Sequence, residues 1–112
     1  MARPKYSIPT PAEQRALNFL HAHGSANVRE YLEKGDHPEG HAYTSVMSLL
    51  SVMYEKGLAT RTVEGRAFRY KPAISQAELR AVVVADVLQN VFEGDLDALR
   101  AVVSGLKSGK KK

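Results

Sequence analysis

Small hydroxyl side chains on one face of a predicted helix are the residues of this chain best suited to hydrogen-bond a large partner. Thr44, Ser48 and Ser51 share one side of a helix that we predict from about Tyr43 to Lys56. Short side chains leave room for a bulky surface, whereas Glu or Lys is the usual choice on a solvated face because Ser and Thr are mediocre helix formers. The pattern favours a docked surface over an ordinary solvated face.

A basic hairpin is predicted directly after this helix, in the sequence LATRTVEGRAFRYKP. Residues 56–72 carry five Lys or Arg and one acid. Cations gathered in this way either solubilise a surface or displace the counterions of nucleic-acid phosphates. A helix with a short polar face beside a cationic ribbon fits the DNA groove, so we expect phosphate contacts here. The expected contacts are Arg61, Arg66, Arg69 and Lys71.

The opposite side of the helix and one face of the hairpin are predicted to build a core. Apolar residues recur in the helix at i, i+3, i+4 and i+7, which places them on one face. They are Val46, Leu49, Leu50 and Met53. In the hairpin, Phe68 and Tyr70 alternate with cations, so we expect both aromatic rings to face inward around a turn at Glu64-Gly65.

Two earlier helices and two later ones complete the predicted order. Capping boxes begin helices at Thr10, Asn27 and Ser75, and Asp95 can cap a last one. We expect these helices to end at Gly24, near Lys34-Gly35, near Phe92 and near Leu106, with a loop over 35–41. The fold class is therefore mainly α with a small antiparallel β wing: a winged helix-turn-helix over 8–73 followed by a helical region over 75–106.

The two C-terminal helices carry more apolar surface than a small domain can cover, because 81–85 is apolar almost all the way round. We therefore expect a dimerisation arm in which two copies cover each other. Its predicted interface comprises Leu79, Val82, Val83, Val87, Val91, Phe92, Leu96, Leu99, Val103 and Leu106. The basic tail, 107–112, should be disordered.

Composition bounds the remaining possibilities. A chain of 112 residues with 44% hydrophobic and 25% charged residues is a single folded domain. Without cysteine it has no thiolate metal site, and its four histidines lack metal-ligand spacing, so we expect no cofactor. No catalytic constellation or nucleotide fingerprint is present, and no segment resembles a signal or a membrane span. We expect a cytoplasmic protein that is not an enzyme.

In motif order and spacing, AYTSVMSLLSVMYEKGLATR followed by EGRAFRYKP resembles the penicillinase-repressor family of winged-helix transcriptional regulators, and the similarity covers about residues 9–106. The resemblance implies a dimeric repressor that binds palindromic operator DNA and dissociates from it in response to an inducing signal. It implies base-reading and backbone contacts on the recognition helix at Tyr43, Thr44, Ser45, Met47 and Ser48. Alternatively, Tyr43 packs on the hairpin and Met47 lies at the edge of the core.

Three departures from the family pattern bear on contacts and induction. Val52 stands where members often have arginine, and Val102-Val103 stands near the Asn-Phe bond that a sensor protease cuts in beta-lactam-responsive members. The cysteine motif of the copper-responsive members is absent. The sequence therefore supports neither known trigger, and the further partner is either a sensor protease that cuts at an altered site or an unknown inducer. The alternatives to a specific repressor are a winged helix that binds protein and a low-specificity architectural DNA binder that relies on its tail.

Overall fold

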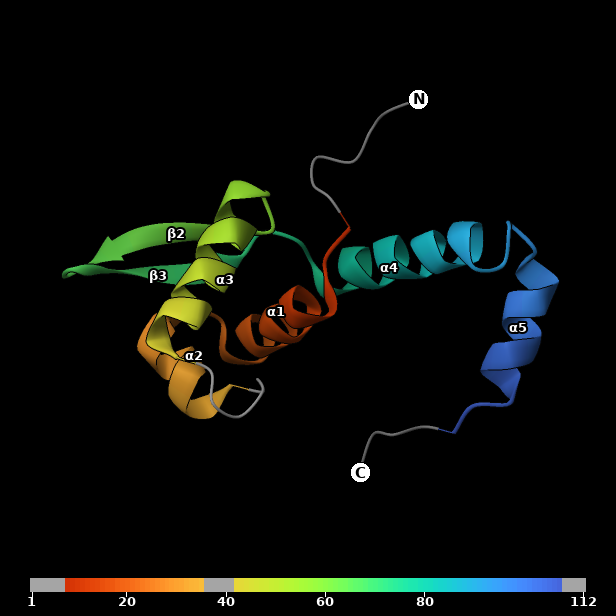
Figure 1. Ribbon diagram of the computed structural model, residues 1–112, viewed down its shortest axis with the longest axis horizontal. Coiled ribbons are helices and arrows are strands. Elements are labelled where there is room, and N and C mark those ends of the chain that lie inside the picture. Colours follow the sequence, from red (N-terminus) through yellow and green to blue (C-terminus); the bar gives the residue numbers. More distant parts are fainter. Residues whose placement is uncertain (1–7, 36–41, 108–112) are drawn as a thin grey trace.

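The computed structural model describes residues 8–35 and 42–107, which form five helices and one three-stranded antiparallel sheet (Figure 1). The predicted order of elements is confirmed, with one short strand added. The elements are α1 (Pro11–His23), β1 (Ala26–Asn27), α2 (Val28–Lys34), α3 (Tyr43–Glu55), β2 (Ala59–Glu64), β3 (Ala67–Pro72), α4 (Gln76–Asn90) and α5 (Leu96–Ser104).

Reciprocal capping boxes begin α1 and α2, as predicted. The Glu13 N–H donates to Thr10 Oγ1 at 3.2 Å, and the Thr10 N–H donates to Glu13 Oε1 at 2.9 Å. Asn27 and Glu30 exchange the same pair of bonds at the start of α2. Each box satisfies two backbone N–H donors that a helix end otherwise leaves to water, so both helix starts are fixed by local sequence.

The core lies between α1, α2, α3 and the sheet. Val46, Leu50 and Met53 are fully buried, and Leu49 packs at the edge of the core. The predicted apolar stripe of α3 is therefore confirmed. The other buried apolar residues are Ala16, Leu17, Leu20, Ala26, Val28, Tyr31, Leu58, Ala59, Tyr70, Ile74 and Leu79.

The sheet has the strand order β1-β3-β2, so β3 is central. The two-residue strand β1 was not predicted; it pairs Ala26 with Tyr70. The β2–β3 turn lies one residue later than expected, because Glu64 pairs with Ala67 and leaves Gly65 and Arg66 as the loop. Gly65 has φ +63°, a backbone conformation that this two-residue turn needs and that glycine adopts without strain.

The two aromatic rings of β3 do not share the predicted inward position. Tyr70 is buried, but Phe68 is 37% exposed. Phe68 lies nearer the tip of the hairpin, where β2 and β3 extend beyond the helices (Figure 1). The prediction for Phe68 was wrong because alternation along a strand fixes the face of a residue and not the depth of cover over that face.

A buried ion pair joins the start of α1 to the end of α3. Lys56 Nζ lies 2.7 Å and 3.0 Å from the two carboxylate oxygens of Glu13, and the Glu13 residue is only 4% exposed. The same carboxylate also closes the α1 capping box. Glu13 thus fixes the C-terminal end of α3 against α1, and removing Lys56 would leave a buried charge without its partner.

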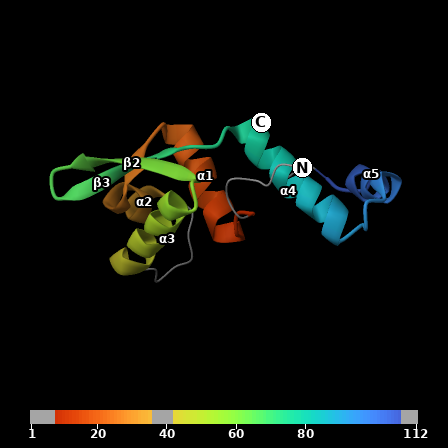
Figure 2. The same ribbon diagram turned by 90° about the horizontal axis from the view of Figure 1, so that it is seen from above.

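The C-terminal arm, defined as α4 and α5, leads away from the other helices in both views (Figures 1 and 2). Leu79 in the first turns of α4 is buried in the core of its own protomer, with Val83 packed beside it. Leu79, predicted for the interface between copies, is thus already covered within its protomer and has little surface left for that interface. Beyond it the arm is open, and α5 contains no buried residue.

The helix starts of the arm match the predictions only in part. Ser75 Oγ accepts from the Glu78 N–H at 3.0 Å, which is one half of the expected capping box. Helix α4 ends at Asn90 rather than near Phe92, and the Asp95 side chain caps α5 through the Ala98 N–H. Leu106 follows the end of α5 and is exposed. The predictions for the 35–41 loop and the 107–112 tail fall mostly outside the described residues.

Candidate nucleic-acid interface

Helix α3 carries a polar outer face on the side away from the core. Thr44, Ser45 and Ser48 are all exposed, and the first turn contains no acidic residue. Among the residues that the structure describes, no side chain caps the start of the helix, and the Ser45 N–H donates to the Ala42 carbonyl, so the Tyr43 and Thr44 N–H groups remain as donors toward an anion. The face can therefore present three hydroxyls and a helix N-terminus to one partner.

Tyr43 and Met47 lie on the side of α3 that faces the hairpin. They are 41% and 42% exposed. Both line a cleft of about 150 Å³ between α3 and β3, together with Arg66, Phe68 and Tyr70. Each side chain thus contacts the hairpin side and keeps part of its surface open, so packing on the hairpin does not exclude a contact with a partner.

Ser51 lines the same cleft as Tyr43 and Met47, because the hairpin covers this end of the polar side of α3. Its side chain is half-buried, and its Oγ lies 3.5 Å from the Tyr70 hydroxyl. The prediction that Ser51 faces a partner together with Thr44 and Ser48 was wrong. One turn beyond Ser48, the outer face continues with the exposed aliphatic side chain of Val52.

The four predicted cations of the hairpin fall into two groups. No hydrogen bond or ion pair within residues 8–35 and 42–107 engages the side chains of Arg61, Arg66 or Lys71. Arg66 and Lys71 are exposed, and Arg61 lies against two aromatic rings. Arg69, in contrast, is held by two carboxylates. Three of the four cations therefore keep their N–H donors free for phosphate oxygens.

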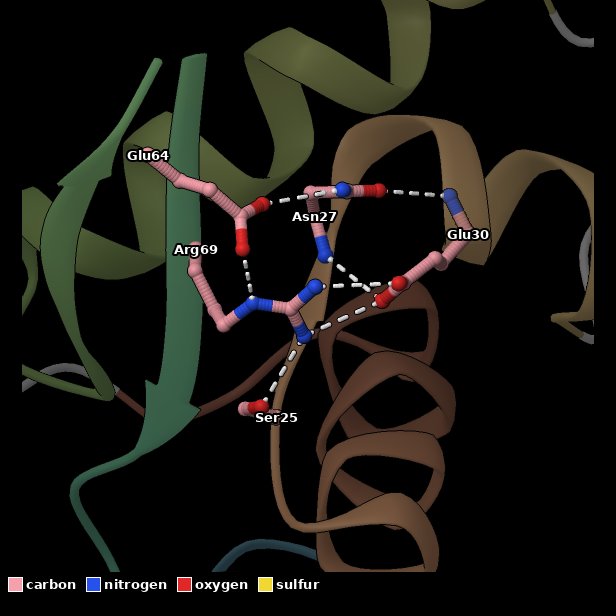
Figure 3. Close-up of polar contacts among 5 residues, drawn as sticks. All are labelled: Ser25, Asn27, Glu30, Glu64 and Arg69. Atoms are coloured by element: carbon pink, nitrogen blue, oxygen red, sulfur yellow. Dashed lines mark hydrogen bonds and ion pairs between the residues drawn. The ribbon is translucent and has the colours of Figure 1, made fainter.

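Arg69 is the centre of a polar cluster that joins the hairpin to the start of α2 (Figure 3). We call Ser25, Asn27, Glu30, Glu64 and Arg69 the Arg69 cluster. Arg69 Nε donates to Glu64 at 2.7 Å, and its two terminal nitrogens donate to Glu30 at 2.9 Å and 3.1 Å. Asn27 links the same groups, since its Nδ2 donates to Glu64 at 3.1 Å and its Oδ1 caps α2.

Electrostatics assign the Arg69 cluster a structural role. The Arg69 hydrogen bonds are the largest cause that holds the pKa of Glu30 and of Glu64 below the ordinary value. The two carboxylates in turn raise the pKa of Arg69 above its ordinary value. One cation and two anions leave a net negative charge, which does not attract phosphate. The expectation that Arg69 contacts the DNA backbone is therefore not favoured by its surroundings.

Arg69→Ala should lower the thermal unfolding midpoint more than Lys71→Ala, an exposed neighbour without an ion pair. Because the folded pKa of Glu30 and Glu64 lies below 4.5, their stabilisation is present above pH 4.5 and is lost as the pH falls through the folded values. The variant should therefore lose part of the wild-type acid dependence. Thermal melts at several pH values between about 3 and 7 measure both effects. Equal melts for the two variants at every pH would contradict the assignment.

The part of the chain that the structure describes holds no group of three acidic or histidine side chains arranged for a metal ion. It also holds no helix long and apolar enough to cross a bilayer. His23 packs on Phe19 with ring centroids 4.1 Å apart, and His21 is half-buried on the same helix. The other two histidines, His37 and His41, lie outside the described residues.

Comparison with protein families matches residues 9–108 to the penicillinase repressors. The match spans all five helices, the hydroxyl face of α3 and the basic hairpin. The chain belongs to the penicillinase repressor family. No curated protein matches the sequence.

Membership confirms the resemblance drawn from the sequence and the winged-helix fold. The penicillinase repressor family is one of DNA-binding transcriptional regulators rather than enzymes. In a winged helix, the second helix of the helix-turn-helix is the recognition helix, and here that position is held by α3. The β2–β3 hairpin is the wing.

Proposed function

We propose that this penicillinase repressor acts in the cytoplasm as a homodimer that binds a palindromic operator and represses transcription of the downstream genes. In each copy, α3 enters the major groove and reads bases with Thr44, Ser45 and Ser48, assisted by Tyr43 and Met47. The wing lies on the neighbouring backbone. The main support is the exposed hydroxyl face of α3 beside three cations that no acid among the described residues neutralises.

The backbone contacts of the proposed interface are Arg61, Arg66 and Lys71, without Arg69. Phosphate contacts fix the register of a protein on the duplex, whereas side chains at base edges specify the sequence. Val52 offers no charge at a position on the outer face of α3, so the proposed backbone contacts come from the wing and from the start of α3. Arg66 is the most favourably placed cation, because it occupies the exposed wing turn.

Dimerisation through the C-terminal arm is supported by the lack of packing on α5 within one protomer. A helix of nine residues is marginal in isolation, since helices shorter than about 12–15 residues are unstable in water without packing. Helix α5 has no buried residue, and Val91, Val102 and Val103 are exposed. A second copy that covers this surface would stabilise α5 and place two recognition helices on one duplex. The interface we propose is the predicted set without Leu79.

Two double variants separate base reading from phosphate binding. Thr44→Ala with Ser48→Ala should lower affinity for the operator about tenfold and leave affinity for unrelated DNA unchanged, because only base contacts are lost. Arg66→Ala with Lys71→Ala should weaken binding to both duplexes and reduce the slope of log K against log salt by about 1.8, from two lost phosphate contacts.

Fluorescence anisotropy with the DNA upstream of the chain's own gene and with a scrambled duplex measures both variants. Circular dichroism melts serve as the folding control, and all four positions are exposed, so little loss of stability is expected. Equal binding of wild-type protein to the two duplexes would contradict operator recognition. It would favour the architectural DNA binder instead.

A further inference from the structure

Arg61 differs from the other cations of the wing in its surroundings. Its guanidinium carbon lies 4.0 Å from the centroid of the Tyr54 ring and 4.0 Å from that of the Phe68 ring. Tyr54 belongs to the last turns of α3, and Phe68 belongs to β3. Arg61 itself lies on β2, opposite Tyr70. Its contacts therefore join the end of the recognition helix to both strands of the wing.

Both ring centroids lie 4.0 Å from the guanidinium carbon, and neither contact is a hydrogen bond to the Arg61 N–H groups. A guanidinium lying over an aromatic ring is attracted by the ring quadrupole, while its N–H groups point outward in its own plane. Within the described residues no carboxylate or other acceptor takes these N–H groups. Arg69 directly precedes Tyr70, the β3 partner of Arg61, and has the reverse arrangement, with its N–H groups on Glu30 and Glu64.

Arg61 is also less mobile than an arginine extended into solvent. Its residue is only partly exposed, whereas Arg66 is exposed at the turn. A free arginine loses side-chain entropy when it takes hold of a phosphate, and a stacked arginine has already lost part of it. Binding a phosphate therefore costs Arg61 less side-chain entropy than it costs an arginine in solvent, so the same contact gives a higher affinity.

We propose that Tyr54 and Phe68 are positioning residues that hold Arg61 ready to bind one DNA phosphate beside the C-terminal half of α3. The site takes a backbone phosphate and no base, because a partly covered side chain on the α3 side of the wing presents donors without reaching a groove floor. This inference rests on the proposed function, since it needs DNA bound along α3 and the wing. Tyr54 and Phe68 would thus affect DNA binding although they neither contact bases nor carry charge.

Variants of Arg61 and variants of the two rings should change DNA affinity and its salt dependence in different ways. Arg61→Ala removes the phosphate contact, so the slope of log K against log salt should fall by about 0.9. Tyr54→Leu keeps the charge and loses the ordering, so affinity should fall about threefold to tenfold while the salt slope stays that of wild type. Tyr54→Phe retains the ring and should bind as wild type does. Phe68→Leu should act like Tyr54→Leu.

A double-variant cycle measured by anisotropy tests the coupling on the upstream duplex and on an unrelated duplex of equal length. The Tyr54→Leu loss should vanish when Arg61 is already alanine, and it should be equal on both duplexes, because a phosphate contact is indifferent to sequence. A Tyr54→Leu loss that persists in the Arg61→Ala background would overturn the positioning role. A Tyr54→Phe loss as large as that of Tyr54→Leu would assign the contact to the tyrosine hydroxyl and overturn it as well.

Failure of this inference can be told from failure of the proposed function. If wild-type protein binds the upstream duplex with a steep salt dependence, and Arg61→Ala leaves that slope unchanged, the proposed phosphate site is wrong while DNA binding stands. If wild-type protein binds neither duplex, the proposed function fails, and the inference fails with it. Arg66→Ala is the matched control, since it should lower the salt slope without any coupling to Tyr54.

Discussion

Val91→Asp with Val103→Asp should convert the protein to a monomer and lower its affinity for operator DNA by about a hundredfold or more. Both valines are exposed in the protomer, so the charges cost little in an isolated chain but would be buried between two copies. Linking two binding modules raises overall affinity by about 10²–10⁴ without new contacts, and a monomer loses this gain. Sedimentation velocity gives the oligomeric state, and anisotropy gives the affinity.

Gln89→Asp with Ser104→Asp is the matched control for this arm variant. It adds the same two negative charges to α4 and α5 at exposed polar positions outside the apolar stripe. The control should remain a dimer and should lose only the small affinity that two added charges remove by repulsion of the DNA. A Val91→Asp, Val103→Asp protein that still sediments as a dimer and binds as the control does would contradict the assigned role of the arm.

Leu50→Ala should lower the free energy of unfolding by about 2–5 kcal/mol, since the side chain is fully buried in the core beneath the reading face of α3. Removing Cγ and its two methyl groups leaves a cavity that the surrounding helices fill only in part. Val52→Ala, two residues on but exposed, is the control and should change stability by no more than about 0.5 kcal/mol. Urea unfolding followed by circular dichroism measures both variants, and equal midpoints would contradict the placement of the core.

Local sequence signals were enough to predict most of the fold. Thr10 and Asn27 each begin a capping box that forms as expected, and the apolar stripe of α3 packs in the core. These features depend on residues within one or two helical turns of one another, so the chain specifies them without knowledge of its tertiary structure. The winged-helix order followed from these elements together.

The pairing of charges could not be predicted, because it depends on residues far apart along the chain. Arg69 looked like its neighbours Arg61 and Arg66, yet Glu30 lies 39 residues away and neutralises it. Lys56 pairs with Glu13 across 43 residues in the same way. A cation's freedom to bind phosphate depends on the acids that tertiary structure brings to it, and β1 is what places Asn27 and the start of α2 beside β3. The two-residue length of β1 gave no alternation to detect.

Depth of burial was the other unpredicted quantity. Periodicity assigned Phe68 and Ser51 to faces, but their exposure depends on how far the helices reach along the wing. The burial of Leu79 could not be predicted for the same reason. The apolar surface of α4 is divided between the protomer core at one end and an open stretch beyond it. Among the candidate DNA contacts, the sequence identified Arg61 by charge, while its stacking on Tyr54 required the fold.

In the proposed complex, two copies joined through the arm place two α3 helices in successive major grooves of one duplex. A footprinting titration on the DNA flanking the gene tests it most directly. We expect two protected half-sites related by a dyad, with centres about 10 base pairs or a multiple apart, filled together over one protein concentration range. Protection of a single half-site, or uniform protection without any preferred site, would contradict it.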